Sequence, residues 1–174
     1  MSVKKIITEP NKILRQISKK VEKVGVQERS LMDDMLDTMY EANGIGLAAI
    51  QIGIPKRIIV MDINWNKGEK KPMYFVNPVV KIKDKEKSIY EEGCLSVPNQ
   101  FAEIERPSKC EVEYINYKGK KKILKAEGLL ATCIQHEMDH LEGILFIDYL
   151  SKLKKTMIIK KLSKQKSKLD RIVV

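Results

Sequence analysis

The sequence predicts an α+β fold, in which antiparallel strands pack around one central helix and a basic amphipathic helix follows at the C-terminal end. Several short segments alternate apolar and charged residues, and their connections are too short for parallel crossovers. One segment of helical spacing carries both of the chain's 2 histidines. The 174 residues can bury a substantial core. We therefore expect residues 1–150 to form the main domain and residues 151–174 a tail of that same domain.

The first long helix is expected between Gln27 and Ala42. Residues 1–25 have mixed apolar spacing and a turn at Pro10-Asn11, which indicates loop and a short helix. From Gln27 the apolar positions recur at helical spacing until Asn43-Gly44, at Leu31, Met32, Met35, Leu36 and Met39. We interpret this methionine stripe as core rather than as a cofactor site.

The strands are expected in the middle of the chain. Arg57–Asp62 reads as a buried strand and Asn64–Lys71 as an exposed loop. Further strands are predicted near Met73–Val76, Val79–Lys83, Glu103–Arg106, Lys109–Tyr117 and Lys121–Lys125. Lys118-Gly119 is typical of a hairpin turn, and Cys110 is interpreted as a small buried hydrophobe. A helix should follow from about Gly128 to Leu141, closed by Gly143.

Both histidines lie in Gln135-His136-Glu137-Met138-Asp139-His140. Residues i and i+4 of a helix share one face, about 40° apart around the axis, so two imidazoles can bind one divalent metal at roughly 2.0–2.1 Å per nitrogen. Glu137 would lie beside the metal without being a ligand, as a general base for an activated water requires. The alternative is that two core-facing histidines share one helix by chance.

The third ligand decides between these alternatives. Thermolysin-like zincins take it from a Glu about twenty residues further on, where this chain has Ile158-Ile159-Lys160-Lys161-Leu162. Metzincins take it from a third His, where this chain has Phe146. Cysteine remains, but Cys133 lies about 10 Å along the helix axis from His140. Cys94 follows a glycine in a segment remote in sequence, so we favour a Cys94-His136-His140 site with an open fourth position.

The segment Gly44-Ile45-Gly46-Leu47-Ala48-Ala49-Ile50-Gln51 has small residues that let another group approach its backbone closely. It lacks the glycine and lysine pattern of nucleotide-binding loops. Gln51 is the polar group that could direct an amide towards a developing negative charge. Gly44, Ile45 and Gly46 would line a substrate pocket together with Cys133, which shares the metal-facing side of the predicted helix.

Gly44–Gln51, Glu92-Gly93-Cys94-Leu95-Ser96 and Gln135–His140 resemble the three signature motifs of the peptide deformylase family, in the same order and at similar spacing. The resemblance covers nearly the whole chain and includes Arg106-Pro107. It implies a catalytic domain that removes the N-formyl group, as formate, from the initiating methionine of nascent bacterial polypeptides. It further implies that the metal ligands are Cys94, His136 and His140, that Glu137 is the acid/base, and that the Gln51 amide and Leu95 N–H contact the oxyanion.

The chain departs from the family pattern at two positions. Ile50 stands where proline is common, and Phe101 stands where some relatives have Arg, which removes a polar contact to the downstream peptide. A thiolate with two imidazoles suits zinc or ferrous iron. The resemblance implies Fe²⁺, often replaced by Ni²⁺, Co²⁺ or Zn²⁺ during purification. Asp139 could orient a ligand or simply be a surface carboxylate.

The net charge of +10 raises nucleic-acid binding as a rival function. The tail from Ser151 to Val174 has eight lysines and one arginine against one aspartate, so +8 lies there. Its apolar residues fall mostly on one helical stripe: Leu150, Leu153, Met157, Ile158, Leu162 and Leu169. The tail is then either a helix packed on the body or, as the resemblance suggests, a helix that docks on ribosomal RNA. A membrane-surface role is less favoured.

The sequence also carries expectations about the compartment. It has no run of about 18 apolar residues, and no signal-peptide stretch follows Met1-Ser2-Val3-Lys4-Lys5. An odd number of cysteines, 3 in all, fits a reducing compartment rather than a disulfide framework. We expect a cytoplasmic monomer without a membrane partner.

Overall fold

A computed structural model describes the backbone of residues 2–172 and the side chains of residues 2–166. Its long helices are α1 (Val26–Glu41), α2 (Gly128–Leu141) and α3 (Lys152–Ile172), and its short 3₁₀ turns are η1 (Lys12–Arg15), η2 (Ala49–Ile52), η3 (Trp65–Lys67) and η4 (Phe146–Tyr149). Its strands are β1 (Gly46–Ala48), β2 (Ile58–Met61), β3 (Met73–Lys83), β4 (Lys87–Cys94), β5 (Val97–Pro107), β6 (Lys109–Ile115) and β7 (Lys121–Glu127). All the paired strands are antiparallel, so the predicted mixture of helices and antiparallel sheet is confirmed.

The larger sheet has five strands in the order β1-β2-β3-β6-β7. Its strand β3 corrects the prediction of two separate strands around Asn77-Pro78. Asn77 has a positive φ of 50°, and the register of β3 against β6 shifts there and again further on. These bulges let the strand continue past a proline, which lacks the N–H needed for a regular ladder.

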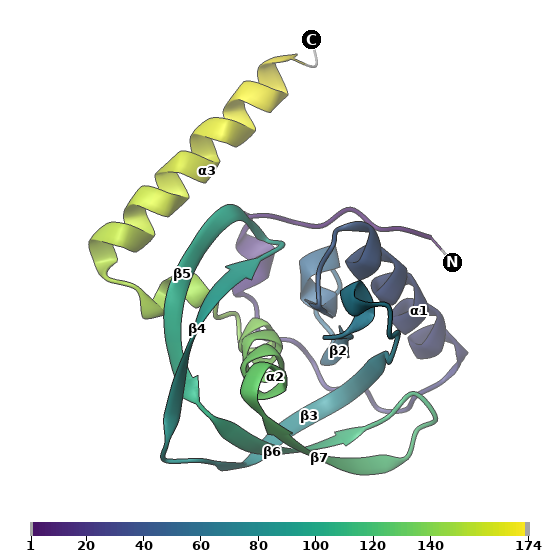
Figure 1. The fold of residues 1–174 in the computed structure, drawn as a ribbon. Coiled ribbons are helices and arrows are strands. Elements are labelled where there is room, and N and C mark those ends of the chain that lie inside the picture. The colour runs from purple at the N-terminus through teal and green to yellow at the C-terminus, as the bar shows by residue number, and fades with distance from the viewer. Residues whose placement is uncertain (1, 173–174) are drawn as a thin grey trace.

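The second sheet is the hairpin β4-β5, and β4 was missing from the prediction. Gly93 within β4 lacks a side chain, and the ring of Phe101 on β5 covers it: a Cβ on Gly93 would lie 2.5 Å from that ring. The inward-facing positions Ser88, Tyr90 and Glu92 of β4 are polar and Ile89 is exposed, so the strand lacks the apolar alternation that predicts a strand. Figure 1 shows this hairpin curving around one side of α2.

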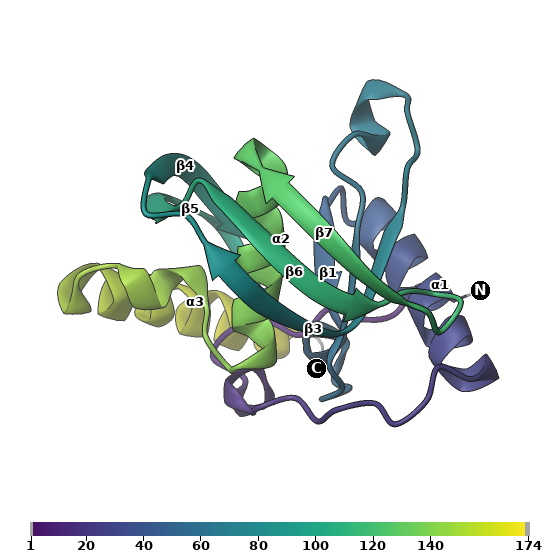
Figure 2. The ribbon, with the colours of Figure 1, turned by 90° about the horizontal axis from the view of Figure 1, so that it is seen from below.

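Helix α2 lies in the middle of the molecule, between the β4-β5 hairpin and the layer formed by α1, β1 and β2 (Figure 1). The larger sheet closes one side, and its outer face is seen in Figure 2. Every residue from Ala131 to Glu137 is buried, so α2 has no solvent-facing side along these two turns. It ends where predicted, and Gly143 beyond it has a positive φ of 72°. A Cβ at Gly143 would lie 2.5 Å from the Arg15 carbonyl oxygen, so this turn requires glycine.

Helix α3 projects from the body, with its first turns beside η4 and β5 (Figure 1). The prediction that its apolar residues fall mostly on one stripe holds for Leu150, Ile158 and Leu162 but is wrong for Leu153 and Met157. Ile158, Ile159 and Leu162 pack on a cluster that includes Val97 and Phe146, whereas Leu153 and Met157 are 71% and 62% exposed. The two groups lie on different sides of the helix because positions 153 and 157 are about 140° or more from position 162. Leu169, also assigned to the stripe, lies outside the described side chains.

No helix among residues 2–172 has the length and apolar composition needed to cross a membrane.

Candidate metal centre

One cluster of metal-binding side chains stands out among the described residues: Cys94, His136 and His140, whose donor atoms all lie within 4.8 Å of one another. The Cys94 Sγ is 3.2 Å from His140 Nε2. Metal bonds of about 2.0–2.3 Å at tetrahedral angles separate ligand atoms by roughly 3.5 Å, so the three donors fit around one small cation. Helix α2 supplies both imidazoles, one turn apart and buried.

The three cysteines have three different environments. Cys94 ends β4 at a shift of register between Gly93 and Cys94, which turns the chain towards α2. Cys133 lies on α2 with its Sγ 3.9 Å from the Ile45 carbonyl oxygen and lines the adjacent pocket. Cys110 is buried in the main core, as predicted. The structure therefore brings Cys94, and neither of the others, to the two histidines.

No role for Glu92 was predicted from the sequence, although Glu92 begins the Glu92–Ser96 motif that contains Cys94. Its Oε2 lies 2.8 Å from His136 Nδ1, which leaves Nε2 of this ring to face the donor cluster. The Arg106 guanidinium donates to both Glu92 oxygens, at 2.6 Å and 3.0 Å, and to Asp139 Oδ2 at 2.8 Å. Tyr149 also donates to Asp139, at 2.8 Å. Asp139 is therefore more than a surface carboxylate, because it binds the same guanidinium that holds Glu92. The available signal was a carboxylate two residues before the candidate thiolate ligand.

These neighbours set the charge of the cluster. Burial alone lowers the pKa of both imidazoles. For His136, hydrogen bonds to Cys94 and Glu92 outweigh burial and raise the pKa well above its usual value. For His140, burial and the charges of His136 and Arg106 lower the pKa well below its usual value. Cys94 and Glu92 thus favour positive charge at His136, whereas His140 stays neutral.

Glu137 lies next to the donor cluster, and its carboxylate has little room to move. A Cβ on Gly46 would lie 2.5 Å from Glu137 Oε1, so any side chain at position 46 would push this carboxylate away from its place. Oε2 is buried without a hydrogen-bond partner among the described residues. Burial, partly offset by His136, raises the pKa of this carboxyl to about 7. A carboxyl group with this pKa can accept and release a proton near neutral pH.

Gln51 and Leu95 both line the pocket beside the cluster. The Gln51 amide oxygen accepts from the Ala48 N–H at 2.8 Å, which turns its NH₂ group towards Ser96 Oγ at 3.1 Å and Cys94 Sγ at 3.6 Å. Leu95 lies in the turn between β4 and β5. The Gln51 amide is therefore held in one orientation, with its donor side towards the site.

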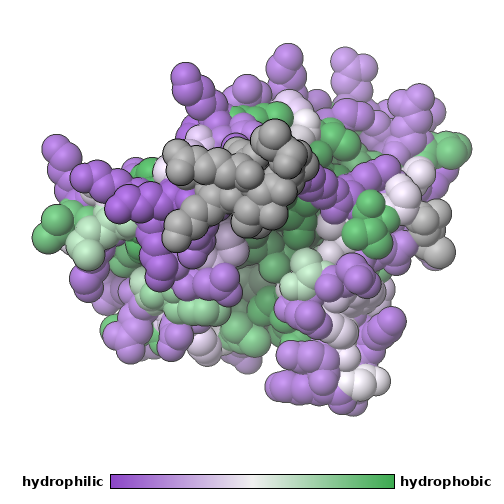
Figure 3. All heavy atoms as spheres, turned by 90° about the horizontal axis from the view of Figure 1, so that it is seen from above, coloured by the Kyte–Doolittle hydropathy of each residue, from purple (hydrophilic) through white to green (hydrophobic). Residues whose placement is uncertain are grey.

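A pocket of about 490 Å³ opens beside the cluster. Its lining is largely apolar and includes Gly44, Ile45, Gly46, Leu95, Phe101, Leu129 and Cys133. Its polar groups include Gln51, Cys94, His136 and Glu137. Figure 3 shows hydrophobic residues in a recess between hydrophilic lobes on the surface seen from above. The size and composition are those of a small-ligand site.

The family model for polypeptide deformylase matches residues 3–156. The chain belongs to the polypeptide deformylase family. It is 76% identical over 174 residues to the peptide deformylase of Pelagibacter ubique, covering 100% of both chains. It is 54% identical over 164 residues to that of Rhizobium meliloti, covering 94% of each. Deformylases depend on a metal, and Cys94, His136 and His140 form a possible metal site in this chain.

Solved structures of this family have the same fold. Peptide deformylase from Ehrlichia chaffeensis in complex with actinonin has a TM-score of 0.91 at 45% identity, with 95% of this chain and 98% of that chain covered. The Legionella pneumophila enzyme has a TM-score of 0.90 at 42% identity, with 98% and 99% covered. The likeness extends over nearly the whole of each chain.

Proposed function

We propose that this chain is a metal-dependent peptide deformylase, which hydrolyses the N-formyl group of the N-terminal formyl-methionine of nascent polypeptides and releases formate. The observation that carries the proposal is the convergence of Cys94, His136 and His140 beside the buried Glu137 and an apolar pocket. Family membership of the chain supports the same reaction.

Cys94, His136 and His140 would hold the metal, for which we propose Fe²⁺ in the cell and Zn²⁺, Ni²⁺ or Co²⁺ as replacements in isolated protein. When bound, such an ion acidifies water and polarises the formyl carbonyl. Glu92 supports this assignment because its hydrogen bond fixes the tautomer of His136. Arg106 in turn fixes Glu92, and Asp139 accepts a further hydrogen bond from the same guanidinium.

Glu137 is proposed as the acid/base. It takes a proton from the attacking water and later gives it to the leaving amine. Its burial beside the donor cluster supports both steps, because a carboxyl with a pKa of about 7 exchanges protons readily near neutral pH. Gln51 and the Leu95 N–H are proposed to stabilise the oxyanion. One such donor contributes roughly 3–4 kcal/mol to transition-state stabilisation in other enzymes.

The pocket is proposed to hold the methionine side chain. Ile45, Leu129 and Cys133 give it an apolar wall, and Gly44 and Gly46 keep it open. An apolar fit discriminates by only about 1–3 kcal/mol per methylene, so formyl-norleucine peptides should also be substrates. A charged side chain would lose its hydration on entering, so formyl-aspartate peptides should be poor ones.

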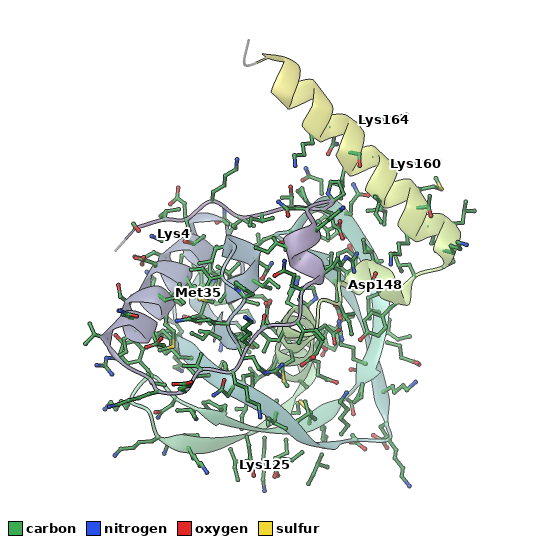
Figure 4. The ribbon with its side chains drawn as sticks, turned by 180° about the vertical axis from the view of Figure 1, so that it is seen from behind. Lys4, Met35, Lys125, Asp148, Lys160 and Lys164 are labelled. Carbon is green, nitrogen blue, oxygen red and sulfur yellow. The ribbon has the colours of Figure 1, made fainter. Side chains whose placement is uncertain are left out.

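For the rest of the molecule we propose residues 1–150 as the catalytic domain and residues 151–174 as a tail of that domain. The tail would dock on the ribosome near emerging chains, in a cytoplasmic protein that acts as a monomer. The charge of α3 and the exposure of Leu153 and Met157 on its outer side support docking. Figure 4 shows Lys160 and Lys164 on this helix, beyond the body of the molecule.

The test of the catalytic proposal is anaerobic purification with metal analysis, coupled to formate release from formyl-Met-Ala. We expect about one metal per chain and formate release that a chelator abolishes. Turnover of formyl-norleucine-Ala but hardly of formyl-Asp-Ala would support the apolar pocket. A protein that binds metal but releases no formate from any of these peptides would overturn the proposal.

A further inference from the structure

The chain's only tryptophan, Trp65, lies outside the catalytic cluster but is linked to the pocket by a hydrogen bond. It begins η3 in the loop between β2 and β3, a loop that the sequence predicts to be exposed. Figure 2 shows this loop, at the top right, on the same side of the molecule as the β4-β5 hairpin. The Trp65 side chain turns inwards, and its Nε1–H donates to the Gly44 carbonyl oxygen at 2.7 Å.

The loop is fixed at its base by Asp62, which is completely buried. Asp62 Oδ2 accepts from the Lys71 N–H at 2.9 Å and from the Tyr40 hydroxyl at 2.7 Å. The Tyr40 ring packs on the Trp65 ring, with centroids 5.2 Å apart. The Lys70 Nζ lies 4.8 Å from the centroid of the Tyr40 ring. These contacts hold the indole in one place, so its hydrogen bond to Gly44 has a fixed direction.

Gly44 in turn contacts the ligand hairpin. A Cβ on Gly44 would lie 2.7 Å from Leu95 Cδ1, so the Leu95 side chain rests directly against this backbone. Both residues line the pocket. The next carbonyl, that of Ile45, accepts from the Asp62 N–H at 2.9 Å. The β2-β3 segment thus fixes two successive carbonyl groups of the pocket wall, one of them through the Trp65 side chain.

We propose that Trp65 is a positioning residue that sets the distance between the Gly44-Ile45 wall and Leu95, and so the width of the methionine pocket. This rests on the proposed deformylase function. Trp65 acts through the Gly44 carbonyl and is not itself among the residues that line the pocket. Loss of its N–H lets the wall move, which weakens the fit of a long side chain more than that of a short one.

The test is Trp65→Phe, which keeps a ring against Tyr40 but removes the N–H donor. The matched control is Tyr117→Phe, which removes an aromatic donor bonded to Asp33 at 3.0 Å, while its ring still packs on Tyr74. One neutral hydrogen bond contributes about 0.5–1.5 kcal/mol, so Trp65→Phe should raise KM for formyl-Met-Ala about two- to tenfold. Because the wall contacts the substrate equally in the ground and transition states, kcat should change less than twofold.

The second readout is the preference for formyl-Met-Ala over formyl-Ala-Ala, measured as the ratio of kcat/KM values. This ratio should fall in Trp65→Phe and stay at the wild-type value in Tyr117→Phe. A tryptophan that only stabilises the loop would lower Tm without changing the ratio, and that result would overturn the proposal. An unchanged KM with full metal content would overturn it as well.

A third readout does not depend on turnover. Trp65 is the sole source of tryptophan fluorescence, so metal-loaded Glu137→Gln protein should show a saturable change in emission on titration with formyl-Met-Ala and none with formyl-Asp-Ala. No change with either peptide would count against a link between Trp65 and the pocket. A wild-type protein without deformylase activity that still gave the saturable change would refute the catalytic proposal and leave the positioning role standing.

Discussion

The Glu92 carboxylate lies 2.8 Å from Nδ1 of His136, and the same carboxylate is held on its other side by the buried Arg106. The hydrogen bond selects the orientation of the imidazole before any cation binds. The arrangement matches the carboxylate–histidine–metal triads in which the outer carboxylate raises ligand basicity.

Glu92→Gln should therefore lower metal affinity about 10- to 100-fold, because an amide holds the imidazole less strongly than a carboxylate. Competition with a chelator, followed by metal analysis, measures this directly. Glu103→Gln on the neighbouring strand changes an exposed carboxylate and serves as the control. Equal chelator resistance in both variants would contradict a role for Glu92 in binding.

Cys94→Ser should lose tight metal binding, whereas Cys133→Ser should keep it. A serine hydroxyl stays protonated at neutral pH and is a poor ligand compared with a thiolate. Cys133 is the matched control because it lies near the site but outside the donor cluster. Metal content after gel filtration gives the answer, and equal loss from both variants would refute the assignment.

Glu137→Gln should retain the metal but lose about 10²- to 10⁴-fold in kcat, since the amide has nearly the same size but cannot accept a proton. Single-turnover formate release with metal-loaded protein is the measurement. Hydrolysis at a rate near that of the wild type, with full metal content, would exclude the acid/base role.

Asp148 of η4 links this turn to η1 and α3, because its carboxylate binds Arg15 of η1 and Lys155 of α3. It also accepts a hydrogen bond from the Leu145 N–H. Burial alone would raise its pKa, but these partners outweigh burial and hold the pKa below its usual value. A carboxyl with a lowered folded-state pKa stabilises the fold above its unfolded pKa of about 4 and loses this contribution as pH falls further.

Asp148→Asn should accordingly lower the free energy of unfolding by about 1–2 kcal/mol at pH 7, a value reduced for the partial exposure of these groups. The difference from wild type should shrink steadily below about pH 4. Urea unfolding at several pH values measures it. Glu127→Gln, which removes an exposed pair with Lys109, should change stability by less than about 0.5 kcal/mol. A difference for Asp148→Asn that persists at pH 2 would contradict the electrostatic origin.

The tail prediction separates docking from catalysis. Lys160→Glu/Lys161→Glu on α3 should abolish salt-sensitive co-sedimentation with ribosomes, because lysine contacts gain RNA affinity by releasing counterions. Hydrolysis of formyl-Met-Ala should be unchanged. The control is Lys121→Glu/Lys122→Glu, which makes the same charge change at an exposed pair on β7 and should co-sediment like wild type. If both double variants co-sediment like wild type, α3 is a packed helix without a docking role.

The spacing of apolar residues and of the two histidines in the sequence predicted the helices α1 and α2. The limits of α1 and α2 follow from apolar spacing and from the glycines that end them. Cys94 was predicted as the third ligand because the alternatives failed at Phe146, at the Ile158–Leu162 segment and at Cys133. The structure places Cys94 beside the two histidines, and its role as a ligand stays a prediction.

Features that depend on contacts between distant segments could not be read this way. In β4, Gly93 is covered by Phe101 of the opposite strand, and the pairing of Glu92 with His136 joins two residues 44 positions apart. Trp65 was expected in an exposed loop because its partner, Gly44, comes 21 residues earlier. The prediction of one apolar stripe on α3 was wrong in part for a related reason. An apolar pattern does not show which of its residues will pack against the rest of the protein.

The close approach of Gly46 to Glu137 also has a consequence for entropy. A free glutamate side chain samples many rotamers, and fixing one costs about 1.5–2 kcal/mol. Here the carboxylate lies in the space that a Cβ at position 46 would occupy, directly against the β1 backbone. That ordering cost is met once, when the chain folds, and does not recur as part of the activation barrier at each turnover. A larger residue at position 46 would displace the carboxylate itself, so the acid/base role proposed for Glu137 depends on this glycine.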